Sequence, residues 1–309
     1  MNEYRIQAKL MGSLFELIVG HENEKEARFF LDIGVREIER IENKLSEFRE
    51  HTFTTLLNTN AGVKPVQTDN EVYGLLERCQ RISALTRGAF DITVGPLKKL
   101  YRFRNSEFSL PSKSSVDEAL GKTGYQYLRL DPTDRSAYLS KRHMSVSFAA
   151  VGKGYAADCV KKLWIEKGLA SGVISASGDL TTIGCKPDGS PWKIGIADPD
   201  NTQDMLVYIP VHNASVATSG DYEQYFMHKG IRYSHTINPV SGMPVTGIKS
   251  VSIVSPSAEL SDALATAVYV MGVKTGLDFI GQLPATHCLI IDDHDQMHYS
   301  KHIEIQNEK

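Results

Sequence analysis

The sequence of 309 residues contains only four cysteines, and no two of them form a CxxC pair. No secretory context accompanies them, and scattered single thiols make both a disulfide framework and a zinc site improbable. We therefore expect Cys79, Cys159, Cys185 and Cys288 to be core or near-surface thiols.

Long hydrophobic runs and an excess of one charge are also absent. No window reaches the roughly 18 consecutive apolar residues of a membrane-spanning helix. The 34 basic and 37 acidic residues give a formal net charge of -3, without the basic tract typical of nucleic-acid binding. The N-terminal 20 residues alternate in polarity and lack the features of a signal peptide. These absences predict no membrane span, no nucleic-acid partner and, unless a leader was trimmed, a cytoplasmic location.

The pattern of apolar residues predicts helices and strands in an irregular order. Spacings of three and four predict helices over residues 24–48, 70–86, 153–167 and 257–271, with the second helix burying a stripe from Val72 to Leu85. Short β-branched and aromatic segments predict strands at 4–11, 15–20, 172–177, 192–197, 205–212, 250–255 and 287–292. Without regular βαβ alternation, this order favours an α+β fold, with helices packed on largely antiparallel sheets in a single domain, residues 1–309.

The segment SFAAVGKGYAAD, residues 147–158, places Lys153 between two glycines at a strand-to-helix turn. A nucleotide-binding P-loop needs glycine at 147 and serine or threonine at 154, but the chain has Ser147 and Gly154. Small residues and a lysine at a helix start still suit an anion such as phosphate. A tight turn with a solvated lysine is an equally open interpretation.

A second loop, GAFDITVGPL at residues 88–97, pairs an aromatic ring with a carboxylate. Phe90 could stack on a planar ligand while Asp91 accepts from its ring N–H. Alternatively, the segment is a turn after a helix, with Phe90 buried.

Asp262 and Thr266 are four residues apart in the predicted fourth helix, so they share one face and could offer oxygen ligands to Mg²⁺. Two oxygens are too few for a metal unless a phosphate supplies others. The alternative is a solvent-facing acid near a helix N-terminus and a threonine bonded to a backbone carbonyl.

His235 stands just before the rigid turn NPVSG. A histidine held in this way could act as a positioned base. A satisfied histidine at a strand end would give the same pattern.

Taken in order, these segments resemble the ApbE family of flavin transferases over nearly the whole chain. The matching segments are Met11 to Ser13, Ser46 to Phe48, Leu57 and Asn58, GAFDITVGPL, VGKGYAAD, ASGDL, ATSGDYEQYF, HTINPVSGMPV and SDALATAVYVMG. The resemblance implies a T-fold-related architecture. It also implies an enzyme that uses FAD and Mg²⁺ to transfer FMN to a threonine or serine hydroxyl of a target flavoprotein, with release of AMP.

The resemblance also implies roles for individual residues. His235 would be the base that takes the acceptor's proton. The metal would be held by Ala150, through its carbonyl, and by Asp262, Ala265 and Thr266. The residues implied for FAD are Met11, Phe48, Ala89, Phe90, Asp91, Ser147, Lys153 and Ile237.

Several positions depart from the family pattern. Ser147 stands where the family usually has an aspartate, which removes one carboxylate contact to the nucleotide. Ala149 and Ala150 replace a glycine pair, Ser177 replaces a glycine and Asn238 replaces an aspartate. The sequence leaves three alternatives open: a Mg²⁺-dependent FAD hydrolase that yields FMN and AMP, a non-catalytic FAD-binding protein, and a protein whose clusters are all structural. It also leaves open whether the metal is Mg²⁺ or Mn²⁺.

Overall fold

The computed structural model describes residues 1–101, 110–201, 203–220 and 225–306. Its main sheet has eight strands, and every hydrogen-bonded pair of strands in it is antiparallel. The strands follow the order β1 (Asn2–Leu10), β2 (Ser13–His21), β6 (Gly172–Ala176), β7 (Asp179–Ile183), β10 (Ser215–Gly220), β13 (Ile248–Ser255), β14 (His287–Asp292) and β15 (Met297–Tyr299).

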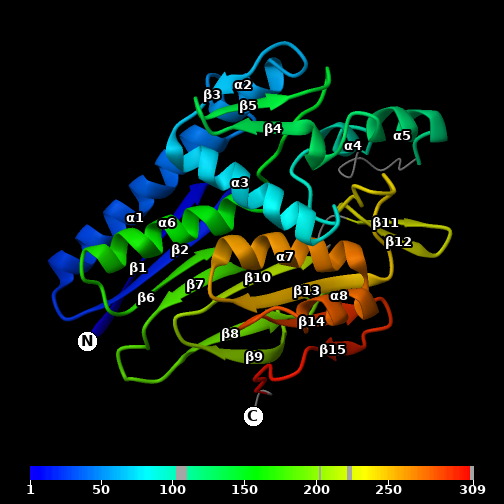
Figure 1. Ribbon diagram of the computed structural model, residues 1–309. Helices are drawn as coiled ribbons and strands as arrows, with labels where there is room; N and C mark the ends of the chain where they lie inside the picture. Colours follow the sequence, from blue (N-terminus) through cyan, green and yellow to red (C-terminus); the bar gives the residue numbers. More distant parts are fainter. Residues whose placement is uncertain (102–109, 202, 221–224, 307–309) are drawn as a thin grey trace.

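Helices cover one face of this sheet and a hairpin packs on the other. Figure 1 shows the helices α1 (Glu24–Leu45), α6 (Gly152–Glu166), α7 (Ala258–Met271) and α8 (Val273–Ile280) along the sheet. On the opposite face, the strands β8 (Trp192–Ala197) and β9 (Met205–Val211) share a hydrophobic cluster with residues of β6, β7, β10 and β14. The predicted α+β architecture with largely antiparallel sheets is confirmed.

The remaining elements form smaller units around this core. A three-stranded sheet joins β3 (Val66–Gln67), β5 (Ser136–Leu139) and β4 (Leu128–Asp131), and a hairpin joins β11 (Tyr225–His228) to β12 (Ile231–Ser234). The other helices are α2 (Phe53–Thr59), α3 (Asn70–Leu85), α4 (Gly95–Lys98), α5 (Lys113–Leu120) and the 3₁₀ helix η1 (Tyr125–Tyr127). In the parts of the chain that the structure describes, no helix is long and apolar enough to cross a bilayer.

The long helices form where the apolar spacing predicts them. In α1, the buried side chains recur at the expected intervals, and the side chain of Asn23 accepts hydrogen bonds from the amides of Lys25 and Glu26 at the N-terminus. The indole of Trp164 in α6 donates to the carbonyl of Phe30 at 2.8 Å, which fixes α6 against α1.

Two details of the predicted helices were wrong. The first helix ends at Leu45 rather than 48, because the chain turns at Ser46, whose hydroxyl accepts from following backbone amides. Leu85 was expected on the buried stripe of α3 but is 52% exposed, because it is the last residue of the helix and lies beyond the region that packs on the core.

Candidate functional site

Three charged side chains from three different elements meet at the start of α6. Lys153, the second residue of this helix, forms an ion pair with Asp179, the first residue of β7. Asp262, in the second turn of α7, accepts a hydrogen bond from the amide of Gly154 at 3.3 Å. At the N-terminus of α6, the Lys153 ammonium and two carboxylates, those of Asp179 and Asp262, therefore lie in one charged cluster.

Close contact between α6 and α7 holds this cluster together. A Cβ atom added to Gly154 would lie 2.2 Å from the carbonyl oxygen of Ala258, so only glycine permits this approach. The carboxylate of Asp158 in α6 accepts hydrogen bonds from the amides of Ala258 and Glu259, at 3.0 and 2.8 Å, and from the hydroxyl of Ser257. It thus caps the N-terminus of α7, the helix that carries Asp262.

Electrostatics in this cluster suit a bound cation. Burial, reinforced by the negative charge of Asp179, raises the pKa of Asp262 to about 7, although the charge of Lys153 opposes this shift. Burial disfavours the charged form of Lys153, but the carboxylates of Asp179 and Asp262 outweigh it and raise the pKa of Lys153. With both carboxylates ionised, the cluster has one positive and two negative charges.

The residues predicted for the metal fit such an ion. Asp262 is 5% exposed, which excludes the solvent-facing acid of the alternative interpretation. Thr266 lies one turn further along α7, and its hydroxyl is 3.3 Å from that of Ser219 at the end of β10. Buried Ala265 lies beside it in the same helix, and Ala150 precedes α6. The buried carboxylate of Asp262, one helical turn from the hydroxyl of Thr266, offers the hard oxygen ligands that Mg²⁺ favours.

The loop before α6 is fixed by a side chain from α2. Asn58 both donates to the carbonyl of Val146, at 3.0 Å, and accepts from its amide, at 2.7 Å. Next to it, the amide of Ser147 donates to the carbonyl of Ile92, and its hydroxyl donates to the carboxylate of Glu47 at 2.8 Å. Hydrogen bonds therefore hold the loop before α6 against the segments that contain Glu47, Asn58 and Ile92.

The loop 88–97 is held mainly by its own aspartate. The carboxylate of Asp91 accepts from the amide and the hydroxyl of Thr93, at 2.8 and 2.7 Å, and from the amide of Tyr125, at 2.7 Å. Phe90 is 1% exposed in the main hydrophobic core, and Ala89 is buried beside it. This arrangement favours the structural interpretation of the loop, and a contact of these three residues with FAD stays a prediction.

Two other predicted FAD residues lie at accessible positions. Phe48 is 92% exposed, so its ring is free to stack on a planar ligand. Met11 occupies the turn between β1 and β2, and its terminal methyl lies 3.5 Å from the position that a Cβ on Gly152 would take. Met11 therefore lies against the start of α6, next to Lys153.

His235 and Ile237 lie on a different segment, directly after β12. The amide of Ser234 donates to the carbonyl of Val245, and the amide of Val245 donates to the carbonyl of Thr236, which makes residues 234–245 a hairpin. The predicted NPVSG turn closes it, with Asn238 accepting from the amides of Val240 and Ser241. Ile237 is buried in a cluster with residues of α4 and α5. The motif ATSGDYEQYF leads towards this hairpin, but residues 221–224 lie outside the described ranges.

Comparison with known proteins decides the family. The sequence model of the ApbE family matches residues 11–290, which is most of the chain. The chain belongs to the ApbE family. A curated FAD:protein FMN transferase of Treponema pallidum is 30% identical over 269 residues, covering 82% of this chain and 74% of the relative. One from Escherichia coli K12 is 28% identical over 281 residues, covering 89% and 80%.

Solved ApbE structures share the fold. The ApbE protein of Thermotoga maritima is 31% identical, with a TM-score of 0.89 over 97% of both chains. The flavinyl transferase ApbE of Pseudomonas stutzeri is 27% identical, with a TM-score of 0.84 over 97% of this chain and 95% of the other. The family and the enzyme class predicted from the sequence, a transferase, are thus confirmed.

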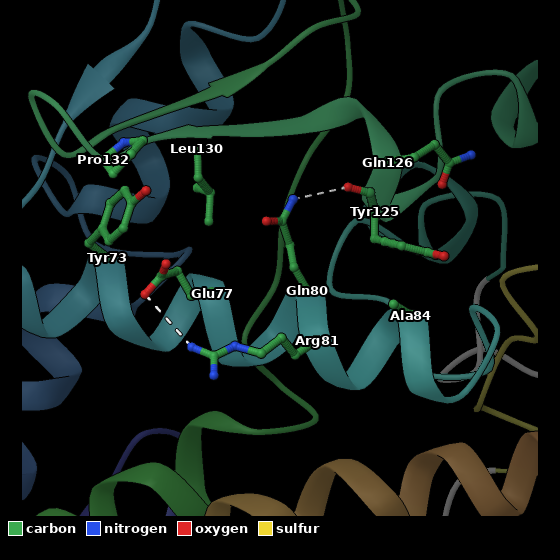
Figure 2. A pocket seen from close by; sticks show the side chains of 9 residues that line it. All are labelled: Tyr73, Glu77, Gln80, Arg81, Ala84, Tyr125, Gln126, Leu130 and Pro132. Carbon is green, nitrogen blue, oxygen red and sulfur yellow. Dashed lines mark hydrogen bonds and ion pairs between the residues drawn. The ribbon is translucent and has the colours of Figure 1, made fainter.

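The ApbE fold of this chain also contains a hollow along α3, with a volume of about 550 Å³. Figure 2 shows Tyr73 and Gln80 of α3 facing Tyr125 and Leu130 across it. Gln80 donates to the carbonyls of Tyr125 and Leu128, which gives it a structural role. None of the predicted FAD or metal residues lines this hollow.

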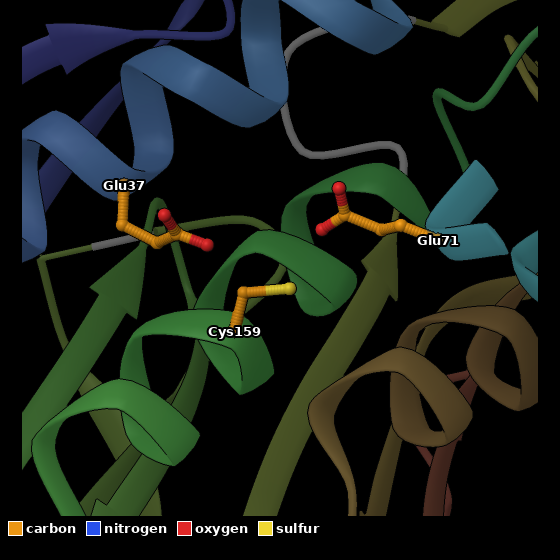
Figure 3. A group of neighbouring side chains, drawn as sticks. All are labelled: Glu37, Glu71 and Cys159. Atoms are coloured by element: carbon orange, nitrogen blue, oxygen red, sulfur yellow. The ribbon is translucent and has the colours of Figure 1, made fainter. Parts of the chain in front are cut away.

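A second group of metal-binding residue types lies between α1, α3 and α6. Figure 3 shows the side chains of Glu37, Glu71 and Cys159 pointing toward one another. Arg40 donates to both glutamates, and this contact, helped by Lys44, lowers the pKa of Glu71 to about 2 despite its partial burial. Burial raises the pKa of Cys159 to about 12. Because the carboxylates already have cationic partners and the thiol stays protonated, this group is a structural ion-pair network.

Sequence reasoning did not single out Asp179, Lys98 or Glu47 as site residues. Asp179 was noted only as part of ASGDL, and its position directly after Gly178 was the one available signal. Lys98 is the exposed last residue of α4.

Proposed function

We propose that this chain transfers the FMN moiety of FAD to a threonine or serine hydroxyl of an acceptor flavoprotein, releases AMP and requires Mg²⁺. The observation that carries this proposal is the buried Asp262 beside the Lys153–Asp179 ion pair, at the position where the family resemblance expects the metal. The name of the curated relatives, FAD:protein FMN transferase, supports the same reaction.

In this proposal, Asp262 and Thr266, with the carbonyl of Ala150, would hold the metal. When bound, Mg²⁺ would supply positive charge that stabilises the negative charge developing on the leaving AMP. Lys153 adds a fixed positive charge on the same side, and its ion pair with Asp179 keeps the ammonium in place. Met11 and the exposed ring of Phe48 contact the nucleotide.

The chemical step exchanges one phosphorus–oxygen bond for another. The acceptor hydroxyl oxygen bonds to the phosphorus of the FMN half while the bond from this phosphorus to the oxygen of the AMP half breaks. His235 takes the proton of the acceptor hydroxyl, and AMP leaves with the bonding electron pair. The products are an FMN phosphoester on the acceptor and free AMP.

The deciding experiment incubates the purified protein with FAD and Mg²⁺, with and without a candidate acceptor domain. AMP release together with a mass gain of FMN minus water on the acceptor supports transfer. AMP with free FMN would instead identify a hydrolase. FAD that binds but stays unchanged leaves two interpretations, a binding protein or an acceptor that is not the natural one. An acceptor with valine at the target threonine is the matched control, and an EDTA-treated sample tests the metal requirement.

The role of His235 needs its own variant. We expect His235→Ala to abolish transfer while FAD binding, followed by quenching of flavin fluorescence, stays within about twofold of the parent protein, because a base contributes mainly to the chemical step. Full transfer activity in this variant would remove the assignment.

A further inference from the structure

The hydroxyl of Ser147 is hydrogen-bonded to the carboxylate of Glu47, which lies far away in the sequence. Ser147 is only 3% exposed, and its hydroxyl donates to Glu47 at 2.8 Å across 100 residues of sequence. Serine carries no charge, so the negative charge beside this buried hydroxyl comes from Glu47, in a different segment of the chain.

The segment that carries Glu47 is held in a defined shape. The hydroxyl of Ser46 accepts from the amides of Phe48 and Arg49, both at 3.2 Å, and the hydroxyl of Thr52 donates to the carbonyl of Ser46 at 2.6 Å. Nevertheless, this braced turn leaves Glu47 exposed and Phe48 92% exposed. A rigid turn that presents an aromatic ring and a tethered carboxylate side by side is arranged for a planar, hydrogen-bonding ligand.

The hydrogen bond from Ser147 also ties the carboxylate of Glu47 to the loop before α6. Ser147 itself begins the loop that leads to Lys153. Glu47 thus stands at the border of the site proposed for the diphosphate, on the side where Phe48 is exposed.

We propose that Glu47 is a substrate-binding residue whose carboxylate, held in place by Ser147, accepts hydrogen bonds from hydroxyl or ring N–H groups of the FAD nucleotide. This inference rests on the proposed function, because it takes FAD as the substrate. Ser147 is then a positioning residue that acts through Glu47.

Variants that remove the carboxylate at position 47 or place one at position 147 test whether Glu47 binds FAD. We expect Glu47→Ala to weaken FAD binding about tenfold or more, since hydrogen bonds to a charged group are among the stronger ones. Glu47→Gln keeps the size of the side chain and should show most of this loss. Ser147→Asp alone places two carboxylates side by side and should also weaken binding. The double variant E47A/S147D carries one carboxylate again and should return to within about threefold of the parent affinity.

FAD affinity is measured by quenching of flavin fluorescence, with thermal midpoints to confirm that every variant folds. Glu50→Ala, in the same turn, is the matched control and should bind FAD like the parent. Parent-like affinity in Glu47→Ala, or a double variant no better than Glu47→Ala, overturns the assignment while the proposed function stands. Failure of the parent protein itself to bind FAD overturns both.

Discussion

Replacing Asp262 by asparagine should make the metal-free protein more stable while it abolishes the proposed metal binding. Asparagine has the same shape, and its carbonyl oxygen can still accept from the amide of Gly154. It carries no charge, so the cost of burying a carboxylate disappears, together with the repulsion from Asp179. The loss of metal binding and the gain in unfolding free energy then have the same cause, the loss of the negative charge at position 262.

The size of this gain follows from the pKa of Asp262. Its pKa is raised from 3.8 to about 7, so the folded state binds the proton more tightly than the unfolded state. The carboxylate therefore costs no stability below the unfolded pKa, and its cost grows as the pH rises towards the folded pKa. At about 1.4 kcal/mol for each pKa unit, the cost reaches about 4 kcal/mol at pH 8 and stays below about 2 kcal/mol at pH 5.

Urea denaturation in the presence of EDTA gives the unfolding free energy of the parent and of Asp262→Asn at pH 8 and at pH 5, and the difference between the two proteins is the cost of the carboxylate at each pH. We expect the variant to be more stable at both, by more at pH 8. Addition of Mg²⁺ at 100 times its Kd should raise the unfolding free energy of the parent by about 2.7 kcal/mol and leave the variant unchanged. A metal-free variant less stable than the parent at pH 8 would refute the reasoning.

Three further substitutions test how the site is built. Gly154→Ala should lower the unfolding free energy by more than about 2 kcal/mol, because the new Cβ would lie 2.2 Å from the carbonyl oxygen of Ala258. Gly74→Ala in α3 is the control: its Cβ would meet only the end of the flexible Arg78 side chain, so this variant should be as stable as the parent or more stable. Asp158→Ala removes two backbone hydrogen bonds at the N-terminus of α7 but leaves the N-cap hydroxyl of Ser257, so it should lower the unfolding free energy by about 1 kcal/mol. An unchanged denaturation midpoint would contradict the capping role of Asp158. Lys153→Met leaves the buried Asp179 without its cation, so it should lower the unfolding free energy by about 3 kcal/mol at pH 8. It should also weaken FAD binding in the fluorescence assay. Parent-like stability together with parent-like affinity would exclude the role given to the ion pair.

The long helices and several strands could be predicted because their signals are local. The apolar spacing of α1 and the glycine after α7 mark both elements within a few residues. The strands β7 and β10 in the middle of the main sheet were missed. Their buried residues include Thr181 and Ser215, whose hydroxyls bond to each other at 2.8 Å. Polar side chains that satisfy one another inside a sheet erase the hydrophobic pattern on which such predictions depend.

The candidate site was predictable only in part for a similar reason. Lys153 and Asp262 stand in segments with a recognisable spacing, so the sequence identifies both. Their partners are set by packing: Asp179 meets Lys153 because β7 lies beneath α6, and Glu47 meets Ser147 across 100 residues. No local pattern encodes such pairs. The exposure of Phe48 and the burial of Phe90 likewise depend on which faces the rest of the chain covers.

The order of strands in the main sheet has a consequence for how the chain is made. β2 pairs with β6, which is synthesised about 150 residues later. At about 5 to 20 residues per second, the inner edge of β2 waits roughly 8 to 30 seconds on the ribosome for its neighbour. At first, the buried side chains Phe15, Leu17 and Val19 can be covered by α1, which follows immediately and packs on β2. An unpaired strand edge is a template for aggregation. Slow synthesis or a weakened α1 should therefore reduce the yield of folded protein before any effect on the finished enzyme is seen.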